Sequence, residues 1–176
     1  FDASLLPTYI SPLMRKYYFW KSNLSKEEKE SRKELFGSFK ESFYPLKPYT
    51  WRFKNKKTLL EIPVTTMPVF KIPFHQSYLL FISNISTGLM KFYLRFAIMM
   101  CKVTRTQPSY LLHPLDLIGK DVVPELAFFP GMNVLSPRKL QIFETTMTIL
   151  KNNFELLPMG EFAARVKPVK TISLES

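Results

Sequence analysis

Proline is the residue type that most constrains how this chain can fold. The 176 residues include 14 prolines and only five glycines. Because proline cannot continue a helix, long uninterrupted helices are not expected. Pro7 and Pro12 exclude one continuous helix over residues 1–20, where we expect a loop with short helical turns.

The composition is that of a globular chain, 46% apolar, and the length suits about one domain. Lys and Arg total 25 against 14 Asp and Glu, for a net charge of +11. The single cysteine, Cys101, can form neither an internal disulfide nor a zinc ribbon. The chain begins at Phe1 without a signal-peptide pattern, which indicates a processed chain or an internal piece of a longer one. The cellular compartment is left open.

Hydrophobic spacing and end signals predict helices that alternate with short strands. The predicted order is a helix over 26–36, a strand over 58–64, a helix over 77–103, a strand over 110–113, a helix over 136–152, a strand over 154–157 and a short helix over 159–166. Residues 38–57 are predicted as a loop, and residues 167–176 as a disordered tail. This alternation predicts an α/β fold with parallel strand pairing.

The most apolar stretch, residues 78–101, is predicted not to cross a membrane. It contains Lys91 and Arg95, and a cation near the centre of a spanning helix costs a few kcal/mol. A buried amphipathic helix is the better interpretation, and no transmembrane segment is expected.

The chain has only two histidines, His75 and His113, and neither has a partner at helical metal-ligand spacing. His113 ends a predicted strand, where the ligand crevice of α/β folds lies, and an imidazole there can give or take a proton. The alternative is a structural histidine bonded to backbone or to Asp116, three positions on. For His75, a loop residue that caps or supports the next helix is the favoured interpretation.

Basic and aromatic side chains mix around Trp20 and around Trp51. Such mixtures can neutralise phosphates and stack on bases. They also form ordinary domain rims, and no RNA- or DNA-binding motif accompanies them, so no nucleic-acid partner is predicted.

Three short motifs together resemble the polysaccharide deacetylase (NodB-homology) carbohydrate esterases. Residues 110–114, Tyr-Leu-Leu-His-Pro, resemble the Leu-x-His motif of that family, residues 59–64 resemble its "lEiPv" strand, and residues 1–4 resemble its "YDSS" element. The family fold is a distorted (β/α) barrel. The resemblance implies that residues 1–166 are the C-terminal portion of such a barrel, a partial barrel of about three strands with intervening helices.

The resemblance also implies a chemistry and a set of site residues. Family members remove N- or O-acetyl groups from a glycan with a divalent metal, usually zinc. It makes His113 the general acid, Asp2 the carboxylate that tunes it, and Leu111 and His75 substrate-binding residues. Asp116 lies nearer to His113 in sequence but has no counterpart in the family.

The metal-binding motifs of the family, Asp-Asp and His-x-x-x-His, are not in this sequence. The resemblance therefore implies that the metal ligands come from a missing N-terminal half of the same domain, and that this chain alone is inactive. The alternative function is a basic, non-catalytic binding module for an acidic polymer or a membrane surface, using the charge of +11. The sequence does not reveal the sugar, the acyl group or the oligomeric state.

Overall fold

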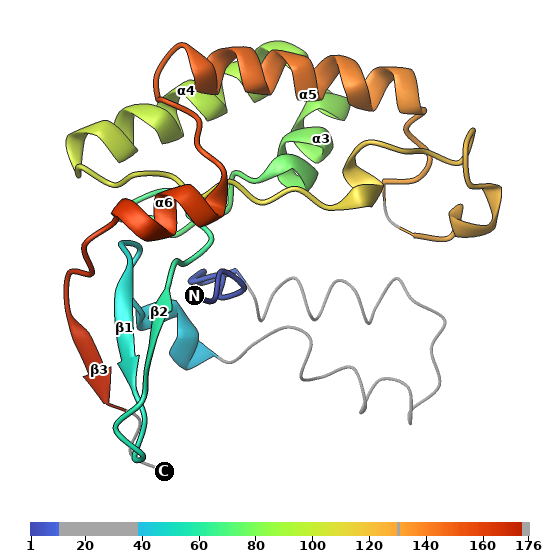
Figure 1. The fold of residues 1–176 in the computed structure, drawn as a ribbon. Coiled ribbons are helices and arrows are strands. Elements are labelled where there is room, and N and C mark those ends of the chain that lie inside the picture. The colour runs from blue at the N-terminus through green and yellow to red at the C-terminus, as the bar shows by residue number, and fades with distance from the viewer. Residues whose placement is uncertain (11–38, 130, 174–176) are drawn as a thin grey trace. The chain divides into compact units, whose positions relative to one another are not determined.

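The structure is a computed structural model that describes residues 1–10, 39–129 and 131–173 (Figure 1). The chain forms two compact units: unit 1 is Phe1–Ile72 with Lys167–Ser176, and unit 2 is Pro73–Val166. Over the described ranges there are four α-helices and one three-stranded sheet, so the protein is α/β, as the sequence predicts. The predicted helix over 26–36 lies outside the described residues.

The sheet belongs to unit 1 and has the strand order β2-β1-β3. Strands β1 (Tyr49–Arg52) and β2 (Thr58–Glu61) form an antiparallel hairpin, preceded by the 3₁₀ helix η2 (Phe39–Phe43). Strand β3 (Thr171–Ser173) pairs in parallel with the other edge of β1. The indole of Trp51 donates a hydrogen bond of 3.0 Å to the buried carboxylate of Glu61, which ties the two hairpin strands together.

Several strand predictions are wrong. Residues 110–113 and 154–157 form no strand in the described structure, and β1 and β2 are antiparallel. Residues 110–113 pair instead with a helix start, where the amide of Gln76 donates to the carbonyl of Leu111 at 3.4 Å. Strand β1 lies in the segment predicted as a loop, and β3 lies in the segment predicted as a disordered tail. Strand β3 depends on pairing with the distant β1, which a local pattern does not report.

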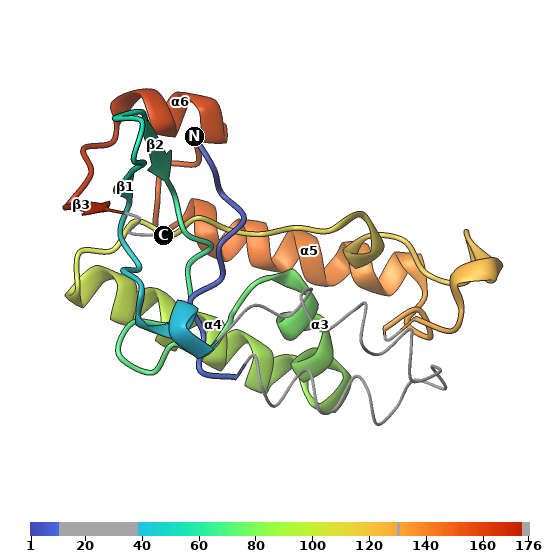
Figure 2. The same ribbon diagram turned by 90° about the horizontal axis from the view of Figure 1, so that it is seen from below.

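Unit 2 contains the helices α3 (Gln76–Ile85), α4 (Thr87–Val103), α5 (Ser136–Lys151) and α6 (Met159–Arg165), with the 3₁₀ turns η3 (Pro114–Asp116) and η4 (Pro124–Leu126). Helix α3 packs against both α4 and α5 (Figure 2). These three helices contain fully buried apolar side chains: Leu79, Met90, Leu94, Ala97 and Ile142. The predicted bounds of α5 and α6 are confirmed to within a residue.

The single helix predicted over 77–103 is in fact two helices, α3 and α4, separated at Ser86. Ser86 has extended backbone, with φ −159° and ψ 129°, and its hydroxyl accepts a hydrogen bond from the amide of Leu89 at 3.3 Å. A serine that caps a new helix start offsets the hydrogen bonds lost at the break. No helix of the described residues combines the length and the apolar character needed to cross a membrane.

Position 119 requires glycine, because the backbone just before α5 passes very close to it. Its amide donates to the hydroxyl of Ser136, the first residue of α5, at 2.8 Å. A Cβ at this position would lie 2.3 Å from the carbonyl oxygen of Val134, which is closer than any real contact. We expect Gly119→Ala to lower the free energy of unfolding by about 1–3 kcal/mol, because backbone must shift to admit the methyl group.

Urea unfolding of the purified chain, followed by circular dichroism, measures this effect. Gly160→Ala is the matched control, since a Cβ at Gly160 in α6 meets nothing within 4 Å. Alanine favours a helix over glycine, so the control is expected to be neutral or slightly stabilising. Equal stability changes for the two variants would contradict the prediction.

Candidate functional site

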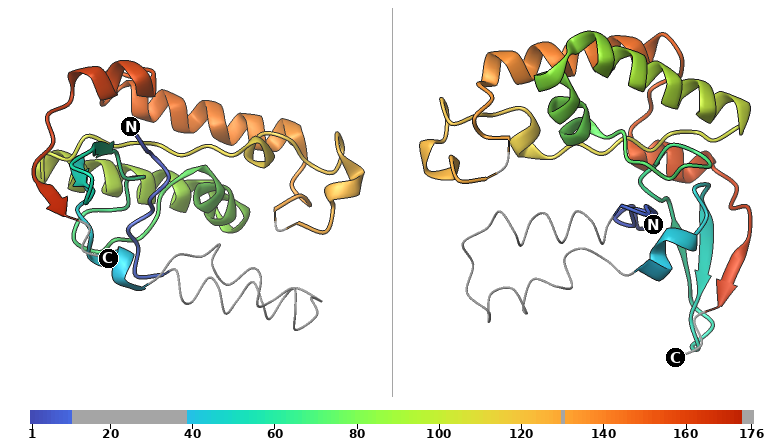
Figure 3. Two further views of the ribbon diagram at one scale, coloured as in Figure 1. Left: turned by 60° about the horizontal axis from the view of Figure 1, so that its bottom comes forward. Right: turned by 180° about the vertical axis from the view of Figure 1, so that it is seen from behind.

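The candidate site lies in unit 2, where the extended segment after α4 passes the first turn of α3 (Figure 3). Two hydrogen bonds join the segment to the helix start. The amide of Gln76 donates to the carbonyl of Leu111, and the hydroxyl of Tyr110 donates to Oε1 of Gln76 at 2.8 Å. This attachment brings His113, at the end of the segment, beside His75 and Ser77 at the start of α3.

His113 is held by a carboxylate that folds back from η3. Oδ2 of Asp116 accepts a hydrogen bond from the amide of His113 at 2.9 Å and lies 3.5 Å from its Nδ1. Oδ1 of Asp116 accepts a hydrogen bond from the hydroxyl of Ser77 at 2.6 Å. The side chain of Asp116 is 7% exposed and that of His113 is 52% exposed. A buried, fixed carboxylate therefore backs an imidazole that solvent can reach.

The arrangement indicates which nitrogen of His113 is available for chemistry. Both Asp116 and the Ser77 hydroxyl, 3.4 Å away, lie on the Nδ1 side of the ring. Nε2 makes no hydrogen bond within the described part of the chain, so it is the atom that can exchange a proton with a ligand. A Ser-His-Asp relay is not formed, because the Ser77 hydroxyl donates to the carboxylate and not to Nε2.

His75 occupies the N-cap position of α3, but its side chain makes no capping hydrogen bond. The residue is 5% exposed, and its Nδ1 has no hydrogen-bond partner among the described residues. Its ring meets those of Tyr78 and His113 edge to face, with centroids 4.8 and 5.9 Å apart. Burial lowers the pKa of His75 to about 4, with a smaller contribution from His113 that Asp116 opposes. At neutral pH the imidazole of His75, which lies next to that of His113, is therefore uncharged.

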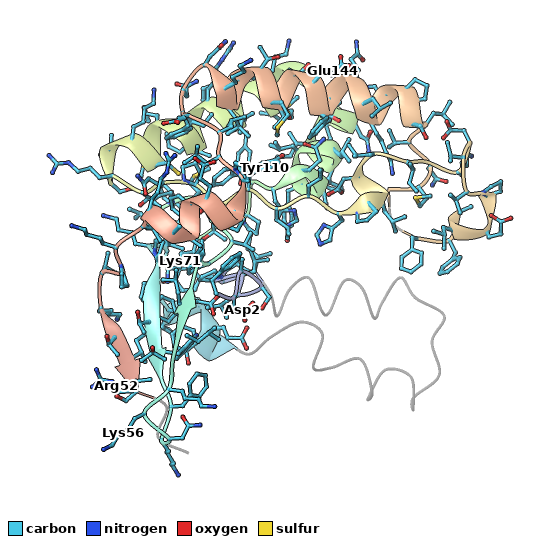
Figure 4. All side chains as sticks on the ribbon, in the orientation of Figure 1. Asp2, Arg52, Lys56, Lys71, Tyr110 and Glu144 are labelled. Atoms are coloured by element: carbon cyan, nitrogen blue, oxygen red, sulfur yellow. The ribbon has the colours of Figure 1, made fainter. Side chains whose placement is uncertain are left out.

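The four site residues from the sequence do not all lie in one unit. His75, Leu111 and His113 belong to unit 2, and Leu111 is half-buried two residues before His113. Asp2 belongs to unit 1, where Figure 4 labels it. Its carboxylate accepts hydrogen bonds from the amide of Ala3 at 2.7 Å and the hydroxyl of Ser4 at 3.1 Å, so it closes a local turn.

The carboxylate beside His113 is that of Asp116. The sequence alone suggests this pair, because only three positions separate the two residues. No sequence signal pointed to Ser77, because nothing local marks a contact between residues so far apart in the chain. Its one available clue was its place at the start of a predicted helix, near His75.

Lys139 of α5 fixes the loop that carries Asp116. Its side chain is buried, and Nζ donates to the carbonyls of Leu115 at 2.6 Å and Ile118 at 2.8 Å. Burial lowers the pKa of Lys139, opposed by the nearby carboxylates of Asp116 and Asp121. The ammonium group thus holds the two ends of the turn in place under the site.

We expect Lys139→Met to lower the free energy of unfolding by about 1–3 kcal/mol, since it leaves two partly buried carbonyls without a donor. Urea denaturation measures the loss. The control is Lys120→Met, in the same region, whose side chain is exposed. If both variants unfold at the same urea concentration as the parent chain, Lys139 does not hold the loop.

The described residues do not fit a catalytic metal. No group of three or more His, Cys, Asp or Glu side chains is placed to hold one there. Asp116 is already engaged by Ser77 and by the His113 amide. Cys101 is buried, and burial raises the pKa of its thiol to about 12, so it supplies no thiolate at neutral pH.

Comparison with known proteins adds no relative from which a role could be transferred. No family model, no curated protein and no solved structure matches this chain.

Proposed function

We propose that this chain supplies the proton-donating side of a glycan deacetylase, a metal-dependent hydrolase that removes N- or O-acetyl groups. One observation carries the proposal: a half-exposed imidazole, His113, is fixed against the buried carboxylate of Asp116. The same histidine closes the Leu111-Leu112-His113 sequence, which resembles the Leu-x-His motif of the polysaccharide deacetylases.

Each site residue has a role that follows from its surroundings. Hydrolysis of an acetamide needs a proton for a poor leaving group, and Nε2 of His113 can deliver it. Asp116 holds the imidazole in place, since its carboxylate bonds the His113 amide and lies 3.5 Å from Nδ1. Leu111 offers apolar surface for an acetyl methyl group, and neutral His75 lets a substrate approach without adding a second cation.

The proposal includes a second portion of the protein. A divalent metal, usually zinc in the family, would supply Lewis-acid polarisation of the acetyl carbonyl and activation of water. Its ligands are proposed to come from an N-terminal half of the same domain, and the glycan is the substrate. The finer fold, a partial (β/α) barrel of the NodB-homology type, belongs to the same proposal.

Acetate release tests the function. The chain of residues 1–176 and a longer product, which begins with the codons directly upstream of Phe1, are incubated with acetylated glucosamine oligomers. Acetate is then measured by proton NMR. We expect release by the longer protein, loss of that activity with a chelator, and none from residues 1–176 alone. An upstream sequence without Asp-Asp and His-x-x-x-His motifs, together with no acetate release, would contradict the proposal.

A second candidate, binding of an acidic polymer such as an anionic glycan, is favoured by the tip of the β1–β2 hairpin. The tip consists of the exposed residues 52–57, and four of the six are cations: Arg52, Lys54, Lys56 and Lys57. Figure 4 shows Arg52 and Lys56 near the turn end of the hairpin. Exposed like charges gathered at one turn create a positive potential that attracts polyanions and weakens with salt.

Heparin chromatography tests this candidate. We expect Lys54→Gln/Lys56→Gln to elute at lower salt than Lys120→Gln/Lys151→Gln, which removes the same charge from other exposed positions. Equal elution of the two variants would show that net charge, and not the hairpin, governs binding.

A further inference from the structure

Helix α4 has two apolar faces, and one of them is exposed. Its core face, with Met90, Leu94 and Cys101, is fully buried in unit 2. The opposite face, here called the outer stripe, consists of Leu89, Phe92, Phe96, Met99 and Val103. These positions alternate steps of three and four, so they share one side of the helix.

Large apolar side chains stand in solvent along the outer stripe. Phe92 is 68% and Val103 is 74% exposed, and Leu89 and Met99 are each about half exposed. The rings of Phe92 and Phe96 lie parallel, with centroids 6.5 Å apart and an interplanar angle of 13°. Phe96 is only partly exposed, but the other four positions form a row of exposed apolar side chains. Such a row marks a contact surface, since single exposed apolar residues need no explanation but rows of them do.

The charges beside the outer stripe all have one sign. Lys91, Arg95 and Lys102 follow each other at steps of four and seven, so they line one flank of the stripe. Neither α3 nor α4 contains an acidic residue, and no Asp or Glu occurs anywhere between Glu61 and Asp116. Arg95 is exposed, whereas Lys102 donates to the side-chain carbonyl of Asn153 at 2.7 Å.

We propose that the outer stripe of α4 docks on an anionic membrane surface, with the helix lying in the interface. An interfacial helix combines bulky apolar residues on one face with Lys and Arg beside them, which is the pattern of this stripe. The helix does not leave the protein to do so, because its core face stays packed in unit 2. This inference goes beyond the proposed deacetylase and does not depend on it.

Charge favours a lipid surface over a second copy of this chain. Antiparallel pairing of two outer stripes about a two-fold axis would bring two rows of cations together, and α4 has no carboxylate to offset them. Anionic headgroups supply the opposite charge along the whole flank, at about 1 kcal/mol for each Lys or Arg near the surface.

Vesicle co-sedimentation of the full chain tests the proposal. The vesicles are phosphatidylcholine alone or phosphatidylcholine mixed with phosphatidylglycerol. We expect the parent chain to bind the mixed vesicles. Binding of Phe92→Gln/Met99→Gln to the same vesicles is expected to be at least about ten-fold weaker, because apolar burial is lost. We expect about five-fold weaker binding for Arg95→Gln, on the mixed vesicles only.

Phe128→Gln is the matched control, since Phe128 is also strongly exposed but lies in the loop after η4. It is expected to bind as the parent chain does. Circular dichroism confirms that each variant is folded, which their exposed positions favour. Equal binding of the parent chain and Phe92→Gln/Met99→Gln, or no binding to the mixed vesicles, overturns the proposal. A dimer that this double variant abolishes in the absence of lipid also overturns it, since a second copy would then cover the stripe.

Discussion

His113→Ala is expected to lower kcat by a factor of about 10²–10⁴ in a complete deacetylase that contains this chain. The proposed task of His113 is to protonate the departing amine, and a positioned acid contributes a factor of that size. The proposal rests on the half-exposed ring, the Asp116 carboxylate 3.5 Å from Nδ1, and an Nε2 that makes no hydrogen bond to the residues the structure describes. Metal content is expected to be unchanged, because His113 is not proposed as a ligand.

A structural role for His113 would give a different set of results. Loss of a structural histidine lowers the melting temperature and the rate together, whereas loss of an acid lowers the rate alone. Kinetics, bound metal and melting temperature are therefore measured on the same preparation. Leu112→Ala, an exposed neighbour on the same segment, is the matched control. A kcat near that of the parent enzyme would remove His113 from the mechanism and with it most of the case for a deacetylase.

Acidification is expected to destabilise unit 2 through His75, by about 3 kcal/mol between pH 7 and pH 4. Burial lowers the pKa of this imidazole from 6.5 to about 4 in the folded chain. A lowered pKa means that the unfolded chain binds the proton first. The stability contribution is therefore complete above pH 6.5 and is lost progressively as the pH falls toward 4.

His75→Leu tests this linkage, because leucine fills a buried site without a titratable group. Urea unfolding at a series of pH values between 7 and 4 is expected to show a shallower loss of stability for this variant than for the parent chain. His113→Gln serves as the control and keeps most of the dependence, since burial and not His113 is the larger cause of the shift. The same pH dependence in His75→Leu and in the parent chain would show that His75 is not the group responsible.

Local signals predicted the helices well. The pair Ser136-Pro137 marks the start of α5, and the apolar positions Leu140, Phe143 and Met147 give its period. The same signals merged α3 and α4, because the apolar spacing continues through Ser86 and only its capping contact reveals the break. The run at 110–113 looked like a strand because a short apolar stretch has no period that separates a strand from other partly buried backbone.

In the candidate site, too, local contacts could be predicted from the sequence and contacts between distant segments could not. The contact between His113 and Asp116 spans three residues and was within reach of the sequence. The contacts of Asp116 with Ser77 and of His75 with His113 depend on how the segment after α4 passes α3. The choice of Asp2 came from the resemblance to a family, whereas the carboxylate that lies beside His113 in the structure is that of Asp116.

The parallel pairing of β3 with β1 has a consequence for biosynthesis. Unit 2 is one continuous stretch, Pro73–Val166, whereas unit 1 needs residues from both sides of it. On the ribosome, unit 2 can fold as soon as its last residue leaves the exit tunnel. The sheet of unit 1 must wait, with the edge of β1 open, until Thr171–Ser173 has been made. An open strand edge on a nascent chain invites pairing with a neighbour, so this interval is when a chaperone would matter most.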